Sequence, residues 1–108
     1  MRDGDLPAFA AELGIPGLFD VHVHFMHPRV MAKVWAYFDG VGSGLWPVQY
    51  RGTDDERVEH LRAMGVKQFS SLSYAHKPGI AGFMNDWTRE FAERTPDTLW
   101  SSTFYAEP

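Results

Sequence analysis

Two histidines separated by one residue are the side chains of this sequence best suited to chemistry. His22 and His24 lie in residues 18–25, which read Leu-Phe-Asp-Val-His-Val-His-Phe. Because side chains alternate along a β-strand, we expect Asp20, His22 and His24 on one face of a buried strand and the apolar residues on the other. Neutral imidazole is a common metal ligand, and one ion satisfies two neighbouring imidazoles. The pattern therefore predicts a divalent metal site, with Zn²⁺ as the expected ion.

The same pattern has a structural interpretation. Two histidines at a strand end can instead be satisfied by ordinary hydrogen bonds, which they need because a buried polar group without a partner costs about 1–3 kcal/mol. Asp20 also has two interpretations: it orients a metal ligand through a hydrogen bond, or it bonds to a neighbouring strand. The chain has no cysteine, so any metal must use histidine and carboxylate ligands.

Three further residues are candidates for contact with a small-molecule substrate. Arg51 lies in a glycine-rich loop over residues 40–52, where a guanidinium can clamp a carboxylate with two hydrogen bonds; a solvated arginine is the alternative. Trp46 lies in the same loop and is a candidate for a pocket wall. His76 ends the second expected strand, at the edge of the sheet where barrel enzymes bind their substrates.

The elements that must position these side chains alternate between strand and helix. Helices are predicted over residues 6–14, 28–40, 53–65 and 80–94, and strands over residues 18–25, 66–75 and 99–105. Thr53 and Glu56 have the spacing of a capping box and mark the start of the third helix. Strands that alternate with helices predict an α/β fold with a parallel sheet.

The number of strands predicts a larger architecture. A parallel sheet is normally covered on both faces, which three or four helices cannot do well for an open three-stranded sheet. A complete (β/α)₈ barrel takes about 250 residues, whereas this chain has 108. We therefore expect residues 1–108 to be the first three βα units of a TIM barrel, a single domain that is incomplete in this chain.

The stretch Phe19-Asp20-Val21-His22-Val23-His24-Phe25, with Pro28 shortly after it, resembles the first barrel strand of the amidohydrolase superfamily. It is most similar to the amidohydrolase-related branch, which includes aminocarboxymuconate-semialdehyde decarboxylase and γ-resorcylate decarboxylase. In that family both histidines of the first strand bind a catalytic divalent metal, so the resemblance implies His22 and His24 as ligands. It covers nearly the whole chain. The family's remaining ligands, usually two histidines and an aspartate on later strands, have no positions in this sequence.

The resemblance implies a metal-dependent hydrolase that activates water or substrate, and a decarboxylase of the same family is the alternative. The implied substrate is a small molecule, with a carboxylate as its expected polar group, and a homo-oligomer is one form the enzyme can take. A third hypothesis is not enzymatic. It makes the chain an inactive truncated fragment that self-associates or binds a partner through an open sheet edge and apolar faces.

Charge and composition exclude several other classes of protein. The formal net charge is −4 and there is no block of basic residues, which argues against nucleic acid and anionic membrane surfaces as partners. No apolar run approaches the length of about 18 residues that a membrane-spanning helix needs. The N-terminal residues 1–5 are acidic and unlike a secretory signal. These features predict a cytoplasmic enzyme or part of one.

Overall fold

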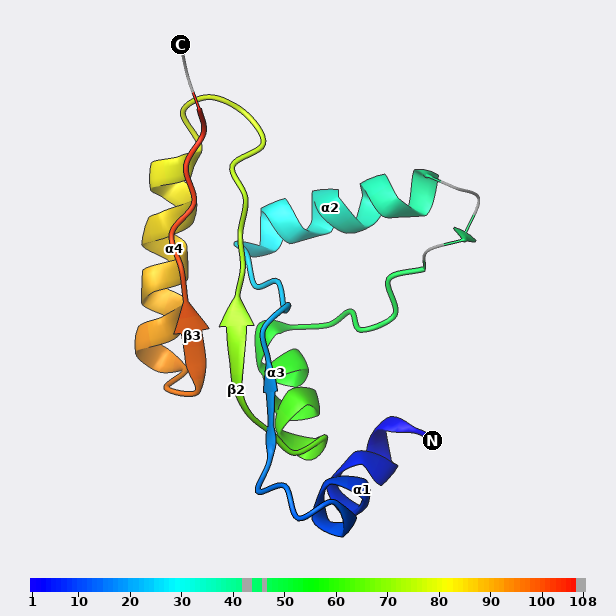
Figure 1. Cartoon of the computed structure of the whole chain (residues 1–108). Coiled ribbons are helices and arrows are strands. Elements are labelled where there is room, and N and C mark those ends of the chain that lie inside the picture. Colours follow the sequence, from blue (N-terminus) through cyan, green and yellow to red (C-terminus); the bar gives the residue numbers. More distant parts are fainter. Residues whose placement is uncertain (42–43, 46, 107–108) are drawn as a thin grey trace.

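A computed structural model describes residues 1–41, 44–45 and 47–106 of the chain. Within this part the fold is mixed α/β, with four α-helices, one short 3₁₀ helix and a three-stranded sheet (Figure 1). In chain order the elements are η1 (Asp3–Asp5), α1 (Leu6–Glu12), β1 (Leu18–Asp20), α2 (Pro28–Gly40), α3 (Asp54–Ala63), β2 (Val66–Ser71), α4 (Ala81–Arg94) and β3 (Thr98–Trp100). The predicted order of helices and strands is confirmed, and each strand is shorter than expected.

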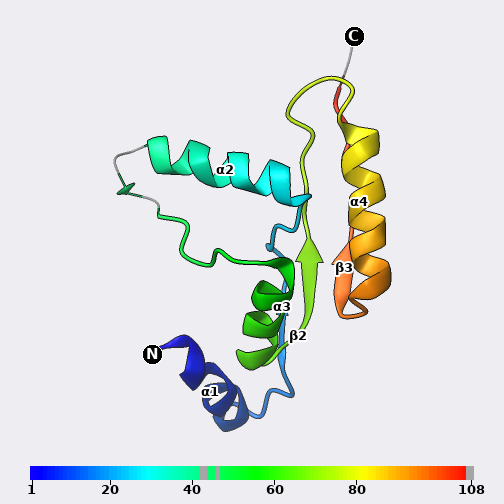
Figure 2. The ribbon, with the colours of Figure 1, turned by 180° about the vertical axis from the view of Figure 1, so that it is seen from behind.

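The sheet is parallel, as predicted. Its strands follow the order β1-β2-β3, and both neighbouring pairs run in the same direction. The segments that follow the strands therefore leave from one edge of the sheet. Figure 2 shows this edge from behind, with the chain after β2 running on and looping over to the start of α4, near the C-terminal end of the chain. Residues 21–25, which we call the histidine stretch, follow β1 and so belong to this edge.

The main core lies between the sheet and two helices. Phe25 and Phe69 are fully buried, and their ring centroids lie 5.5 Å apart. Phe91 of α4 stacks on Phe25 with a centroid separation of 4.6 Å. Val58 and Leu61 of α3 and Val66 of β2 complete the set of buried residues in this cluster. Burial of one such apolar side chain contributes about 1.5–3 kcal/mol, so this cluster fixes α3 and α4 against the sheet, next to the histidine stretch.

Helix α3 begins at the capping box predicted from the sequence. The Thr53 hydroxyl accepts a hydrogen bond from the backbone N–H of Glu56 at 3.2 Å. In return, the Glu56 carboxylate accepts one from the backbone N–H of Thr53 at 2.9 Å. Gly65 has a φ of 83° just beyond the helix, a conformation that glycine adopts without strain. Local sequence signals thus fix both ends of the helix that lies beside the histidine stretch.

Helix α2 projects away from the sheet (Figures 1 and 2). It is held at its start by a second buried cluster, in which Met31 packs with Met84 of α4. Tyr37, nearer its end, is 65% exposed. The radius of gyration is 15.6 Å, against about 13 Å for a compact domain of this length. The projection of α2 opens a space between this helix and α3.

The first strand is shorter than predicted because its own aspartate interrupts it. The Asp20 carboxylate accepts a hydrogen bond from the backbone N–H of His22 at 3.0 Å, and the chain bends at Val21. Pairing with the second strand resumes only at His24, which forms an isolated bridge with Leu72. Short polar side chains that bond to a nearby backbone group compete with strand formation in this way.

The prediction of a fully buried first strand is wrong at its apolar positions. Phe19 is 67% exposed and Val21 is 71% exposed, whereas Phe25 is fully buried. The pairing register also shifts between Leu18 and Phe19. It shifts again between Asp20, which pairs with Phe69, and His24, which pairs with Leu72, because the first strand has one residue more than the second over this interval. These irregularities break the alternation of side chains, so the pattern of residues 18–25 does not translate into one buried face.

The helices in the described residues include none that is long and apolar enough to cross a membrane.

Candidate metal and substrate site

The two histidines lie close enough to share one ion. Their ring centroids are 5.3 Å apart, and the ring planes make an angle of 66°. Two imidazoles bound to one tetrahedral zinc ion, with Zn–N distances of about 2.0–2.1 Å, have ring centroids about 5.2 Å apart. The observed spacing therefore fits the metal that the sequence predicts. Within the described residues, no third histidine, cysteine, aspartate or glutamate joins them in a group able to hold a metal.

His24 is oriented by a neighbouring strand. Its Nδ1 donates a hydrogen bond to the backbone carbonyl of Leu72, just beyond β2, at 3.1 Å. This bond assigns the proton to Nδ1 and leaves the lone pair of Nε2 available. Burial lowers the pKa of His24; the bond to Leu72 opposes this shift, and the nearby charges of His22 and Arg57 add to it. His24 is therefore neutral near pH 7, the form that binds metals.

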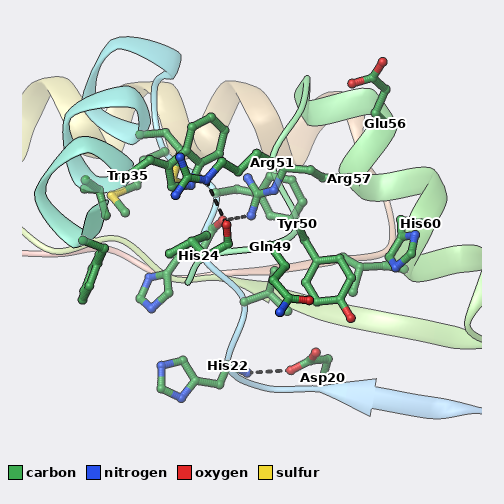
Figure 3. A pocket seen from close by; sticks show the side chains of 18 of the residues that line it. Asp20, His22, His24, Trp35, Gln49, Tyr50, Arg51, Glu56, Arg57 and His60 are labelled. Atoms are coloured by element: carbon green, nitrogen blue, oxygen red, sulfur yellow. Dashed lines mark hydrogen bonds between the residues drawn. The ribbon is translucent and has the colours of Figure 1, made fainter. Parts of the chain in front are cut away.

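His22 is exposed and is positioned through its backbone. Its N–H donates to Asp20, as the dashed line in Figure 3 shows. The Asp20 carboxylate thus fixes the main chain at His22, and the bond is made to the backbone and not to an imidazole ring. The next residue, Val23, is held by β2: Ser70 Oγ accepts from the Val23 N–H at 2.8 Å and donates to its carbonyl at 3.1 Å.

Arg57 of α3 makes a further contact with the histidine stretch. Its Nη2 donates to the backbone carbonyl of His24 at 2.6 Å, and its guanidinium carbon lies 4.3 Å from the centre of the Phe25 ring. Burial lowers the pKa of Arg57, an effect that the Asp54 carboxylate opposes. This guanidinium is the partner of a candidate ligand, and the sequence gives no local signal for its role.

A cavity of about 710 Å³ opens beside the histidines. Its walls are the stretch after β1, the inner side of α2, residues 48–51 and α3. Figure 3 shows both histidines together with Trp35, Tyr50, Arg51 and Arg57 around it. Apolar side chains of α2 and α3 supply much of the lining, with a few polar groups among them, as is typical of small-molecule sites.

Comparison with protein-family models, with curated proteins and with solved structures finds no match to this chain.

Arg51 lines the cavity, and its guanidinium is paired within the protein. Nη1 and Nη2 bond to the two carboxylate oxygens of Asp39, at the end of α2, and Nε donates to the Val48 carbonyl at 2.9 Å. The hydrogen bonds from Arg51 lower the pKa of Asp39. The same guanidinium lies 5.8 Å from the centre of the Trp35 ring. Arg51 thus fastens residues 48–51 to α2 and forms one wall of the cavity.

A second fastening connects this wall to the N-terminus. Tyr50 donates its hydroxyl proton to Asp3 at 2.9 Å, and His60 of α3 bonds to the same carboxylate oxygen at 3.1 Å. The hydrogen bond from Tyr50, and to a smaller extent the one with His60, lowers the pKa of Asp3. The ring centroids of Tyr50 and His60 lie 4.9 Å apart. Both side chains line the cavity on the side of α3.

Of the other two substrate candidates, His76 and Trp46, the structure describes His76. His76 is exposed in the segment after β2 and is not among the described residues that line the cavity. Tyr74, two residues earlier, does line it, and its ring meets the His24 ring edge-on at a centroid distance of 6.0 Å. Trp46 lies outside the described residues. The structure therefore brings together His22, His24, Asp20 and Arg51, with Arg57, Ser70 and Tyr74 as neighbours that sequence reasoning missed.

Proposed function

We propose that this chain carries the metal-binding strand of a metal-dependent hydrolase of the amidohydrolase-related type. The observation that carries the proposal is the separation of 5.3 Å between the ring centroids of His22 and His24. Zn²⁺ is the proposed ion because it is bound readily by imidazole nitrogen in tetrahedral geometry, and another divalent ion can take its place. The substrate is a small molecule bound in the adjoining cavity of about 710 Å³.

In this proposal His22 and His24 would hold the ion through ring nitrogens. Nε2 is the available nitrogen of His24, because Nδ1 already donates to Leu72. When bound, the ion supplies Lewis acidity that lowers the pKa of a water molecule or polarises a substrate oxygen. Two imidazoles are only part of a zinc ligand set. The family resemblance implies that the remaining ligands come from later strands of a longer parent protein.

We also propose that these residues form the first three βα units of a (β/α)₈ barrel. Supporting this, the three strands are parallel and neighbour one another in sequence order. His24 and Tyr74 follow the carboxyl ends of β1 and β2 and have neighbouring rings, and barrel enzymes place their active sites at this end of the strands. The exposed Phe19 and the projecting α2 are surfaces that later units of a barrel would cover.

Decarboxylation at the same site is a second candidate function. The observation that favours it is Arg57 in the cavity wall, whose Nη1 has no hydrogen-bond partner among the described residues, whereas Arg51 is already paired with Asp39. Guanidinium groups recognise carboxylates through paired, charge-assisted hydrogen bonds, and a decarboxylase must bind such a group. The two reactions share the histidine pair and differ in whether water or a substrate carboxylate meets the ion.

Self-association without catalysis is the third candidate. Phe19, Val21 and Leu99 are 67%, 71% and 44% exposed, and in the described residues β1 and β3 each pair with a strand on one side only. Exposed apolar side chains and free strand edges promote association. Light scattering on the purified protein tests self-association. An associated protein gives a mass above the 12.3 kDa of one chain, and a protein that is wholly monomeric contradicts this candidate.

Zinc binding by four proteins tests the metal proposal. Isothermal titration of Zn²⁺ is compared for the wild type, His22→Ala, His24→Ala and the control His76→Ala, which removes an exposed histidine outside the cavity wall. We expect each of the first two substitutions to weaken binding at least about tenfold, since even outer partners of a ligand are worth 10–100-fold. The control is expected to bind as the wild type does. Equal binding by all four proteins would refute the assignment.

A further inference from the structure

We propose that Arg57 is a positioning residue for His24, which it holds in place through the backbone carbonyl. The inference deepens the proposed function and rests on it, since His24 is the ligand that it positions. Arg57 lies on α3, 33 positions along the chain from His24. It therefore ties the helix of one βα unit to the candidate metal-binding residue at the end of the preceding strand.

The contact is short and the guanidinium is fixed on two sides. Nη2 lies 2.6 Å from the carbonyl oxygen of His24, and charge-assisted hydrogen bonds of this length are stronger than neutral ones. The guanidinium carbon lies over the fully buried Phe25 ring, 4.3 Å from its centre. Phe25 is in turn stacked on Phe91. Through this chain of contacts the core determines where the guanidinium lies.

His24 is thus held from two directions. Arg57 holds its main-chain carbonyl from α3, and Leu72 accepts the hydrogen bond of its ring from the segment after β2. His24 needs this support because regular strand pairing stops at Asp20 and resumes only as an isolated bridge at His24. Without Arg57, the direction of the His24 ring depends on the single bond to Leu72.

The fold alone gives Arg57 little reason to be charged. Its Nη1 is buried and has no hydrogen-bond partner among the described residues. The Asp54 carboxylate supplies a compensating charge, and in the described residues no hydrogen bond joins these two side chains. Burying a charge with incomplete hydrogen bonding is unfavourable, and replacing it by an apolar side chain of similar volume is often neutral or stabilising. A purely structural role predicts that Arg57→Met changes the melting temperature alone, whereas a positioning role predicts that it also changes the affinity for Zn²⁺ and the tautomer of His24.

Two readouts on Arg57→Met, Arg57→Lys and the control Arg94→Met test the proposal. Arg94 also lies over the aromatic core, 5.0 Å from the centre of the Phe91 ring, and pairs with Asp54 instead of a histidine carbonyl. The first readout is the Kd for Zn²⁺ with the melting temperature measured alongside. The second, which needs no metal, is the tautomer of His24 from the ¹⁵N chemical shifts of its ring.

For Arg57→Met we expect a Kd for Zn²⁺ raised about tenfold or more, a protein that stays folded at the temperature of the titration, and loss of the preference for the Nδ1–H tautomer. Arg57→Lys, which keeps a donor, is expected to recover part of the affinity, and Arg94→Met to retain wild-type affinity and tautomer. Wild-type affinity and tautomer in Arg57→Met would overturn the proposal, as would a loss of binding that merely follows unfolding. If the wild type binds no Zn²⁺, the proposed function fails, and the tautomer readout still decides whether Arg57 positions His24.

Discussion

Removing the Ser70 hydroxyl tests how the segment between the two histidines is held. Ser70 is 6% exposed, and its Oγ forms hydrogen bonds with both the N–H and the carbonyl of Val23, at 2.8 and 3.1 Å. The neighbouring Ser71 is fully buried, and its Oγ has no partner among the described residues. Ser70→Ala and Ser71→Ala therefore remove the same atom from adjacent buried positions, with and without hydrogen bonds.

The contacts of Val23 set the expected size of the effect. In Ser70→Ala the carbonyl of Val23 keeps its bond from the N–H of Leu72 at 2.8 Å, so only the Val23 N–H loses its partner. Leaving one such backbone group unsatisfied costs about 1–3 kcal/mol, and we expect a loss near the middle of that range. Ser71→Ala removes a hydroxyl that is already unsatisfied, so the free energy of unfolding is expected to stay unchanged or rise by up to about 1 kcal/mol.

Urea unfolding followed by tryptophan fluorescence measures both variants. A loss of 2 kcal/mol in a domain of this size lowers the melting temperature by about 8–16 °C, so thermal unfolding gives a second measurement. The reasoning is refuted if the two alanine variants lose equal stability, or if Ser71→Ala loses more. A change in the urea m-value in only one variant would mean that its denatured state has changed and that the comparison must be made from the thermal data.

Two further predictions concern ion pairing and the segment after the last strand. The hydrogen bonds from Arg62 lower the pKa of Asp97, so the stability this pair contributes is present above the unfolded pKa of about 3.9 and is lost as the pH falls through the lower folded value. Asp97→Asn is therefore expected to be less stable than the wild type at pH 6 and equal to it near pH 2 in urea titrations; a constant difference at both pH values contradicts this. The Asn85 amide bonds to both the N–H and the carbonyl of Thr103, at 2.8 and 2.9 Å. Asn85→Ala is therefore expected to increase amide hydrogen exchange at Thr103 selectively. A rate of exchange at Thr103 equal to that of the wild type contradicts this pairing.

Sequence reasoning located the helices because their signals are local. Thr53 and Glu56 satisfy each other's backbone groups within one turn, and Pro28 stands at the start of α2. Gly65 has the positive φ that follows the end of α3. Each signal is decided by residues within a few positions, so tertiary contacts do not change it. The parallel order of the sheet followed from the alternation of the elements.

The first strand was mispredicted for a reason that is also local in part. Phe19, Val21, Val23 and Phe25 alternate with polar residues, which indicates a strand as far as residue 25. The Asp20 side chain competes for the N–H of His22 and bends the chain at that point. The exposure of Phe19 has a second cause, since burial depends on which other elements cover the sheet. That covering is a property of the tertiary fold and is not encoded in the alternation.

The histidine pair and the nearby Asp20 were predictable, whereas Ser70 and Arg57, which also hold the stretch, were not. His22 and His24 are two residues apart and have a chemistry of their own. Their partners lie far away in sequence: Ser70 is 47 positions from Val23, and Arg57 is 33 positions from His24. A serine in a strand and an arginine in a helix have many ordinary roles. Only the pairing register and the position of α3 show which roles these two residues have.

These supports have a consequence for how the site responds to substitution. In a regular strand, backbone pairing along its whole length would set the direction of each histidine. Here the pairing is interrupted, and the stretch is fixed by three side chains, Asp20 at His22, Ser70 at Val23 and Arg57 at His24. Each acts on the main chain and leaves the imidazole rings free to bind an ion. Substitutions at these three residues are therefore expected to change metal affinity without removing a ligand, and their effects should be smaller than the losses expected at the histidines themselves.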